Sequence, residues 1–286
     1  MAFDLVRTLA PLRHGQRDPT IRFGRREVLL GIRTPGGPAT LRLLHVGGEL
    51  FAEAWGVGAE AAIGHAARLA GLDDRPERLI PRHPVVAELA RTFPGVRLPW
   101  SGRPFDALVP AILEQKVTGS EAFLAWRRLV LRYGEPAPGH PGLMLPPEPR
   151  LLAALPYHAF HPLGIERRRA EAIRRVAGLA ERLLGADADG AARMLRLVPG
   201  IGPWTLAEVR RVAFGDADAV SVGDYHIPHL VSWLLAGEPR GSDARMFELL
   251  EPYRGQRGRV QRLFELSGRF PPRRGPRMAP RDIASI

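Results

Sequence analysis

Apolar and polar residues alternate in two runs near the start of the chain. The runs cover residues 20–28 and 39–45, and the breaker-rich segment 34–37 lies between them. A period of two is typical of a strand with one buried face, and breakers between two such runs predict a turn. The pattern therefore predicts strands of an antiparallel sheet.

Helical spacing follows the predicted sheet. Residues 59–72 and 84–93 carry apolar side chains at helical intervals, and Pro94 with Gly95 ends the second of these helices. Because strands and helices occur together only in this part of the chain, we expect residues 1–95 to form a mixed amino-terminal domain.

Beyond residue 104 the chain has helical spacing interrupted by loops. Residues 105–133 predict two helices that separate near Thr118, and residues 134–149, rich in proline and glycine, predict a loop. Further helices are predicted over residues 149–155, 167–184, 190–197, 203–214, 224–235, 243–253 and 258–267. The expected fold class is therefore α+β, with a helical core over residues 96–268 and a basic flexible tail over residues 269–286, which includes the cluster 273–277.

An excess of basic side chains indicates a polyanionic partner. The 286-residue chain has 41 Lys and Arg against 30 Asp and Glu, a formal net charge of +11. A basic surface gains free energy when it releases counterions from a phosphate backbone. GC-rich coding accounts for arginine in place of lysine, but it does not create an excess of base over acid. Nucleic acid is therefore the expected partner, ahead of an anionic membrane surface.

Cysteine is absent, which excludes disulfides, thiolate zinc sites, iron–sulfur clusters and cysteine nucleophiles. No segment approaches the roughly 20 apolar residues that a membrane span needs. The opening residues carry an acid and no long apolar run, unlike a signal peptide. We therefore expect a monomeric cytoplasmic protein that works on the bacterial nucleoid and has no membrane partner.

The most specific local signal lies between two predicted helices. Residues 197–205 read Leu-Val-Pro-Gly-Ile-Gly-Pro-Trp-Thr. Gly200 and Gly202 permit a tight reversal, and Pro203 suits the first turn of the following helix. Backbone N–H groups at such a helix start bind phosphate well, although the segment also fits an ordinary turn between helices. The pattern predicts a helix–hairpin–helix that contacts the DNA backbone without sequence preference.

Four linked segments together resemble the helix–hairpin–helix (HhH-GPD) DNA glycosylase superfamily, and within it the AlkA-type DNA-3-methyladenine glycosylases II. They are residues 105–117, residues 162–165 ahead of a helix, the hairpin, and residues 224–227 with the sequence Asp-Tyr-His-Ile. The resemblance covers residues 104–264 and implies a two-lobed helical core behind a mixed domain. It also implies a monofunctional hydrolase of base excision repair. Such an enzyme flips an alkylated purine, such as 3-methyladenine or 7-methylguanine, out of damaged double-stranded DNA and hydrolyses its N-glycosidic bond.

By this resemblance Asp224 is the catalytic carboxylate. Breaking the glycosidic bond builds positive charge on the sugar, and a nearby carboxylate stabilises that charge or activates water. Asp224 also precedes an apolar-periodic run, so it is a candidate helix N-cap as well.

The position two residues after the second hairpin glycine separates two kinds of superfamily member. Those that also cut the strand have a lysine there, whereas this chain has Trp204, and its only lysine is Lys116. The resemblance therefore implies no lysine-dependent lyase activity. Trp204 corresponds instead to an aromatic wall of the alkylpurine pocket, which favours a cationic base. The alternative is a core tryptophan of an amphipathic helix.

Two further positions correspond to the base pocket of the family. Phe264 matches a second aromatic wall, and Glu208 stands where the family has an aromatic residue one turn after Trp204. A carboxylate there attracts a cationic base or accepts a hydrogen bond from an exocyclic amine. This departure leaves the lesion open, so a glycosylase for deaminated or oxidised bases and a non-catalytic damage-binding protein remain as alternatives.

The family inserts a wedge from the loop that matches Gln115 and Lys116 into the gap left by the flipped base. We expect Gln115 to be the plug and Lys116 a phosphate contact, with a solvated helix face as the alternative. The remaining expected DNA contacts are Gly200, Gly202, Thr205 and Arg257. No cofactor is expected to be required. The resemblance implies a structural monovalent cation bound by the backbone carbonyls of Arg196, Val198 and Ile201.

Overall fold

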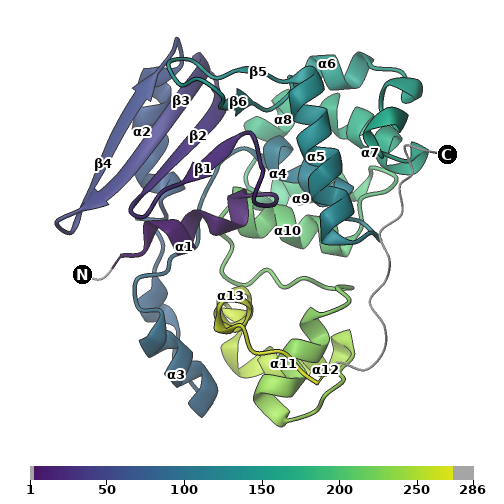
Figure 1. Cartoon of the computed structure of the whole chain (residues 1–286). Helices are drawn as coiled ribbons and strands as arrows, with labels where there is room; N and C mark the ends of the chain where they lie inside the picture. Colours follow the sequence, from purple (N-terminus) through teal and green to yellow (C-terminus); the bar gives the residue numbers. More distant parts are fainter. Residues whose placement is uncertain (1–2, 273–286) are drawn as a thin grey trace.

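The computed structural model describes residues 3–272 and begins with a short helix and a sheet. Helix α1 (Leu5–Leu9) precedes four antiparallel strands that pair in sequence order (Figure 1). The strands are β1 (Ile21–Phe23), β2 (Glu27–Thr34), β3 (Gly37–Val46) and β4 (Glu49–Trp55). Helix α2 (Ala59–Leu69) packs on β3 and β4. The antiparallel sheet predicted from the alternation is confirmed.

The alternation in the sequence is the burial pattern of β3. Its residues Ala39, Leu41 and Leu43 are fully buried in the core beneath the sheet. The turn predicted over residues 34–37 joins β2 to β3. Gly37 there has φ of 117°, a backbone conformation that any side chain would strain.

A second group of helices packs around its own core. Helix α4 (Pro104–Leu113) lies within it and contacts four neighbours, α5, α7, α8 and α10. The other members are α5 (Gly119–Tyr133), α6 (Pro149–Ala154), α7 (Arg167–Ala177), α8 (Ala180–Leu184), α9 (Ala188–Arg196) and α10 (Pro203–Ala213). Short 3-10 turns complete the chain at η1 (Ala10–Leu12), η2 (Pro76–Arg78), η3 (Tyr157–Ala159), η4 (His161–Leu163) and η5 (Glu251–Tyr253). The predicted break near Thr118 falls between α4 and α5.

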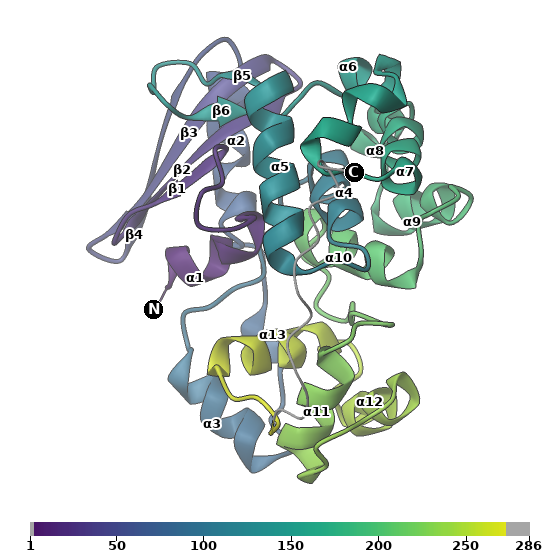
Figure 2. The ribbon, with the colours of Figure 1, turned by 45° about the vertical axis from the view of Figure 1, so that its right-hand side comes forward.

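The third group of helices lies below the other two in Figure 2 and combines distant parts of the chain. Its members are α3 (Pro84–Thr92), α11 (Ile227–Ala236), α12 (Asp243–Leu250) and α13 (Arg257–Ser267). Val86 and Leu89 of α3 are buried in one cluster with residues of α11, α12 and α13. We expected α3 to belong to the amino-terminal domain that ends at residue 95. Its apolar face instead packs against helices that follow much later in the sequence.

The predicted loop 134–149 contains a small ribbon of two paired strands. They are β5 (Glu135–Pro136) and β6 (Met144–Leu145). The backbone N–H of Met144 donates to the carbonyl of Pro19 (2.8 Å), so the ribbon is attached to the amino-terminal domain. Strands of two residues are too short to leave a periodic pattern.

Three other boundaries differ from the predictions. The helix expected over residues 167–184 is two helices, α7 and α8, which separate at Gly178, a poor helix former. The helix expected from residue 224 begins at Ile227. In the predicted tail, Arg269 forms an ion pair with Glu88 of α3, whereas residues 273–286 lie outside the described residues. Within residues 3–272, no helix has the length and apolar character to cross a membrane.

Candidate active site

The predicted hairpin joins α9 to α10. Gly200 has φ of +96°, and a Cβ atom there would lie only 3.2 Å from Cβ of Ala172 in α7, so the backbone conformation and the packing both favour glycine. Gly202 is the N-cap of α10 with φ of −102°, and a Cβ atom there would meet nothing within 4 Å. The hairpin is therefore open to a close approach at Gly202.

The start of α10 is suited to an anion. Among residues 3–272, no side chain caps it, and Pro203 at its first position has no N–H to offer. The first N–H groups of a helix have no partner in the helix and lie at the positive end of its dipole. Thr205 is 1% exposed, and its hydroxyl accepts a hydrogen bond from Gln115. Its side chain is therefore away from the surface, against the prediction that Thr205 contacts DNA.

The loop after α4 is fastened to the hairpin by Gln115. Its Nε2 donates to the carbonyl of Gly200 (2.9 Å) and to the hydroxyl of Thr205 (2.8 Å). Because both amide protons are engaged, Gln115 connects two segments and is not the free plug that we expected. Lys116 beside it is exposed and has φ of +55°, the only positive φ of a non-glycine residue among residues 3–272.

Asp224 lies between α10 and α11, and both of its carboxylate oxygens have partners. Oδ2 accepts a hydrogen bond of 3.0 Å from Nε1 of Trp204. Oδ1 accepts from the backbone N–H groups of His226 (2.6 Å) and Ile227 (2.9 Å). The carboxylate thus binds two backbone N–H groups just before α11, and at the same time it contacts α10. The N-cap of α11 is His226, so Asp224 is not the N-cap residue that the alternative predicted. Asp224 and Trp204 are both half-buried.

Glu208 belongs to a partly buried ionic network that joins α10 to α13. Its Oε1 accepts from the hydroxyl of Ser221 (2.5 Å), and its two oxygens lie 3.2 and 3.3 Å from Nη1 of Arg211. Nη2 of Arg211 donates to both oxygens of Glu265. Burial raises the pKa of Glu208 even though Arg211 opposes the shift. Burial also acts to raise the pKa of Glu265, but there Arg211 and Arg262 outweigh it and lower the pKa.

Two predicted site residues lie away from this arrangement. Phe264 is 0% exposed in the core of the third helix group, so it is not a wall of a base pocket. Arg257 forms an ion pair with Asp218, which also accepts a hydrogen bond from the backbone N–H of Arg257 (3.1 Å). This pairing neutralises the charge that was expected to meet a phosphate. In both cases the partners come from distant segments of the chain.

The carbonyls expected to bind a cation lie at the hairpin turn. Arg196 is the last residue of α9, so its carbonyl lies at the end of the helical hydrogen-bond ladder. The carbonyl of Val198 accepts from the N–H of Ile201 (3.1 Å), which leaves it a second lone pair. Backbone carbonyl oxygens are suitable ligands for hard cations, so these residues fit such an ion.

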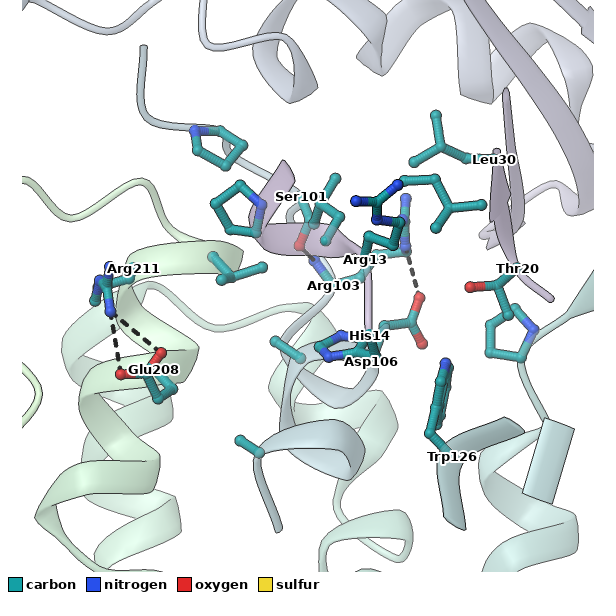
Figure 3. A pocket seen from close by; sticks show the side chains of 18 of the residues that line it. Arg13, His14, Thr20, Leu30, Ser101, Arg103, Asp106, Trp126, Glu208 and Arg211 are labelled. Atoms are coloured by element: carbon teal, nitrogen blue, oxygen red, sulfur yellow. Dashed lines mark hydrogen bonds and ion pairs between the residues drawn. The ribbon is translucent and has the colours of Figure 1, made fainter. Parts of the chain in front are cut away.

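A cavity that the sequence did not predict lies where the amino-terminal segment meets α4, α5 and α10 (Figure 3). Its volume is about 280 Å³. Glu208 and Arg211 line it from α10, Trp126 from α5, and Glu114 from the end of α4. His14 of the amino-terminal segment also lines it, and Nδ1 of His14 lies 3.2 Å from Oε1 of Glu114. Only the departure at Glu208 pointed to this place, because a contact between residues so far apart leaves no local pattern.

Comparison with curated proteins supports the resemblance. No family model matches the chain. Over 125 residues the chain is 34% identical to DNA-3-methyladenine glycosylase 2 of Escherichia coli. This alignment covers 42% of this chain and 44% of that protein. Over 165 residues it is 30% identical to a Mycobacterium tuberculosis protein named "Probable bifunctional transcriptional activator/DNA repair enzyme AlkA", covering 55% of this chain and 33% of the relative. The matches thus span less than half the length of these curated relatives. They confirm the resemblance to the AlkA-type glycosylases.

Comparison with solved structures establishes the fold. A 3-methyladenine DNA-glycosylase from Archaeoglobus fulgidus superimposes with a TM-score of 0.76 at 20% identity, covering 92% of this chain and 95% of that one. A Clostridium acetobutylicum 8-oxoguanine glycosylase/lyase, solved with double-stranded DNA, gives a TM-score of 0.70 at 12% identity, covering 93% and 91%. The predicted α+β class, with a sheet-bearing domain ahead of helices, is confirmed.

Proposed function

We propose that this chain is a monofunctional DNA glycosylase of base excision repair that flips an alkylated purine, such as 3-methyladenine or 7-methylguanine, out of double-stranded DNA. The observation that carries the proposal is the half-buried carboxylate of Asp224, hydrogen-bonded to Trp204 in the first turn of the hairpin helix. A phosphate bound at that helix start would place the neighbouring nucleotide beside the carboxylate. The names of the E. coli relative and the A. fulgidus neighbour support the substrate class.

Asp224 is assigned the catalytic role. As the bond between C1′ and the base breaks, its electron pair leaves with the base and positive charge builds on the sugar. A fixed carboxylate stabilises that charge without reorganising, because two backbone N–H groups and one indole N–H already hold it. Water then adds to C1′ and loses a proton, which leaves an abasic sugar and a free base. A base that is cationic through alkylation departs as a neutral molecule, so no strong general acid is needed.

Trp204 is assigned as the surface on which the flipped base stacks. A base alkylated at a ring nitrogen is electron-poor, and the indole face attracts it by stacking and cation–π interaction. The hydrogen bond from Nε1 to Asp224 fixes the plane of the indole ring. The ring that holds the base and the carboxylate that acts on the sugar are therefore positioned by one contact.

The DNA contacts are assigned to the hairpin and to the loop that Gln115 fastens to it. Backbone N–H groups around Gly202 bind a phosphate, where no Cβ atom or neighbouring atom obstructs the approach. Lys116 takes the place of the flipped base in the duplex, because it is exposed and Gln115 is already engaged. The net charge of +11 favours this complex at low salt.

The product is assigned as an intact abasic site. Strand cleavage by a Schiff base needs an amine that reaches C1′, and the only lysine of the chain is Lys116. The position from which related enzymes present a lysine carries Trp204. An abasic duplex that remains uncut after base release is the expected product.

A monovalent cation is assigned to the carbonyls of Arg196, Val198 and Ile201. It would hold the turn in shape and add positive charge beside the bound phosphate. Replacing potassium by a bulky organic cation at constant ionic strength is expected to lower the melting temperature and the affinity for abasic DNA. Unchanged values of both would remove this assignment.

The proposal is tested by incubating the full chain with methylated genomic DNA and identifying the released bases by mass spectrometry. Release of 3-methyladenine or 7-methylguanine is expected. Release of uracil, hypoxanthine or 8-oxoguanine alone would refute the alkylpurine class. Tight binding of abasic DNA without any base release would refute the enzymatic proposal as a whole.

A further inference from the structure

The cavity beside α10 has a carboxylate-bearing wall. Glu208 contributes one carboxylate, with 22% of its side chain exposed, and Glu114 contributes a second. Burial is the main cause that raises the pKa of Glu208, and the negative charges of Glu265 and Glu114 add to the rise. At about 280 Å³ the cavity is close to the lower end of the roughly 300–1,000 Å³ typical of small-molecule pockets. Its size and its polar wall fit a single nitrogen heterocycle.

The cavity and the proposed catalytic centre share helix α10, although Trp204 and Asp224 do not line the cavity. Glu208 lies four residues after Trp204, so their side chains share one face of α10. The hydroxyl of Ser221 donates to Glu208, and the carbonyl of Ser221 accepts from the N–H of Asp224 (3.3 Å). A base that stacks on Trp204 with its sugar above Asp224 therefore has its far edge directed along α10 toward Glu208.

Glu208 keeps the capacity to accept a further hydrogen bond. Its Oε1 is engaged by Ser221 at 2.5 Å. Its Oε2 has only a 3.3 Å contact with Nη1 of Arg211, an atom that also donates to Ser221 at 3.0 Å. An ionised carboxylate offers about four acceptor positions and no donor. Oε2 of Glu208 can therefore accept a further hydrogen bond from an N–H donor.

We infer that this cavity receives the flipped base and that Glu208 selects bases whose inserted edge carries two adjacent N–H donors. The inference rests on the proposed glycosylase function. Guanine presents such an edge through its ring N1–H and its exocyclic amine, whereas adenine presents an acceptor beside its amine. Methylation at N7 adds a positive charge to the ring, but the charge of Glu208 is already paired with Arg211, so the edge donors carry the selection. The favoured substrate is therefore the 7-methylguanine type and not the 3-methyladenine type.

The amino-terminal domain completes this cavity. His14 comes from that domain, and its imidazole lies 3.2 Å from Glu114 across the cavity wall. Figure 3 shows His14 between Glu208 on one side and Trp126 on the other. The domain that carries no helix–hairpin–helix element thereby contributes to the choice of base.

The test uses duplexes with a single lesion and the full chain under single-turnover conditions. One duplex carries 7-methylguanine and the other 7-methylhypoxanthine, which has the same cationic ring but lacks the exocyclic amine. Each rate is divided by the spontaneous rate of base loss. The wild type is expected to prefer 7-methylguanine by about tenfold or more, because a site that binds an N–H donor rejects the analogue without it. A third duplex with 3-methyladenine is expected to react with the smallest enhancement.

Three variants separate the role of Glu208 in base selection from its role in stabilising the fold. Glu208→Gln replaces an acceptor oxygen by a donor and should lower the 7-methylguanine rate by about tenfold to hundredfold, while the 7-methylhypoxanthine rate falls less. Glu208→Asp keeps the acceptor pair and should retain part of the preference. Glu248→Gln removes an ion-paired glutamate from α12 that is 68% exposed, and it should match the wild type.

The possible results distinguish failure of base selection by Glu208 from failure of the glycosylase function. A folded Glu208→Gln protein that binds abasic DNA and keeps the wild-type preference overturns the inference. If that variant does not fold, the wild type still decides, because equal enhancement of the two 7-methylated bases, or a larger enhancement for 3-methyladenine, overturns it as well. A wild type that releases none of the three bases refutes the glycosylase function itself.

Discussion

The indole N–H of Trp204 donates a hydrogen bond of 3.0 Å to the carboxylate of Asp224. The contact joins the first turn of the hairpin helix to the segment that begins α11. It sets an aromatic face and a negative charge at a fixed separation, and each helps to hold the other in place. Substitutions at Asp224 and Trp204 separate the effect of the negative charge from the effect of the hydrogen bond that positions it.

Asp224→Asn should abolish base release while the protein stays folded. An asparagine oxygen can still accept from the N–H groups of His226 and Ile227, so the free energy of unfolding should change by less than about 1 kcal/mol. The lost charge should lower the single-turnover rate by at least about 100-fold. Circular dichroism and abasic-DNA binding are the controls. Retained activity would contradict the catalytic assignment.

Trp204→Phe removes the indole donor and keeps an aromatic face. Asp224 then loses one of its three hydrogen bonds, so we expect about a tenfold lower single-turnover rate, with affinity for abasic DNA nearly unchanged. Trp204→Ala removes the stacking surface too and should be slower still. If the phenylalanine and alanine variants are equally impaired, the hydrogen bond has no separate role.

Gly200→Ala and Gly202→Ala form a matched pair in one turn. At φ of +96° and against Ala172, alanine at position 200 should cost about 1–2 kcal/mol of stability. Alanine at position 202 meets no neighbouring atom, so its stability should be that of the wild type, but its methyl group occupies the space where the phosphate approaches. Gly200→Ala should therefore lower the melting temperature, whereas Gly202→Ala should weaken DNA binding. Unimpaired DNA binding by Gly202→Ala would place the phosphate elsewhere.

Gln115→Leu and Lys116→Gln separate the attachment of the loop from its contact with DNA. Leucine at 115 leaves the carbonyl of Gly200 and the hydroxyl of Thr205 without their partner and should cost about 1–3 kcal/mol. Glutamine at the exposed position 116 should leave stability unchanged and weaken DNA binding most at low salt. Equal melting temperatures for the two variants would argue against the attachment.

Glu208→Gln should also change how stability depends on pH. Burial raises the pKa of Glu208 above its value in the unfolded chain. Between those two values the folded state binds the proton more tightly, so ionisation of this group lowers the free energy of unfolding as pH rises. The variant lacks that ionisation, and its stability relative to the wild type should increase from about pH 4 to about pH 8. Urea unfolding at both values measures the difference, and a difference independent of pH would refute the shift.

Short-range signals in the sequence were sufficient to predict an antiparallel sheet and the hairpin, but not β4 or the break between β1 and β2. The alternation around Leu41 and Leu43 is the burial pattern of β3, and Gly200 has the positive φ that the predicted tight turn requires. The proximity of Asp224 to Trp204 came from the family resemblance, because twenty residues of chain separate them. The resemblance assigned both residues to one active site, but it did not predict the hydrogen bond between them.

Long-range partners account for the predictions that the structure corrected. Phe264 has the aromatic ring that a stacking wall needs, but the third helix group buries it. Arg257 has the charge that a phosphate contact needs, but Asp218 already pairs with it. Gln115 has the polarity of a plug, but the hairpin engages both of its amide protons. In each case the side chain has the right chemistry, but it is already engaged by a residue from a distant segment of the chain.

The position of α3 has a consequence for how the protein is made on the ribosome. Its apolar residues Val86 and Leu89 pack with α11–α13, which are synthesised more than 130 residues later. At roughly 5–20 residues per second, the apolar face of α3 stays uncovered for about ten seconds or more while the intervening chain emerges. During that interval the apolar face of α3 is exposed to contacts with other chains.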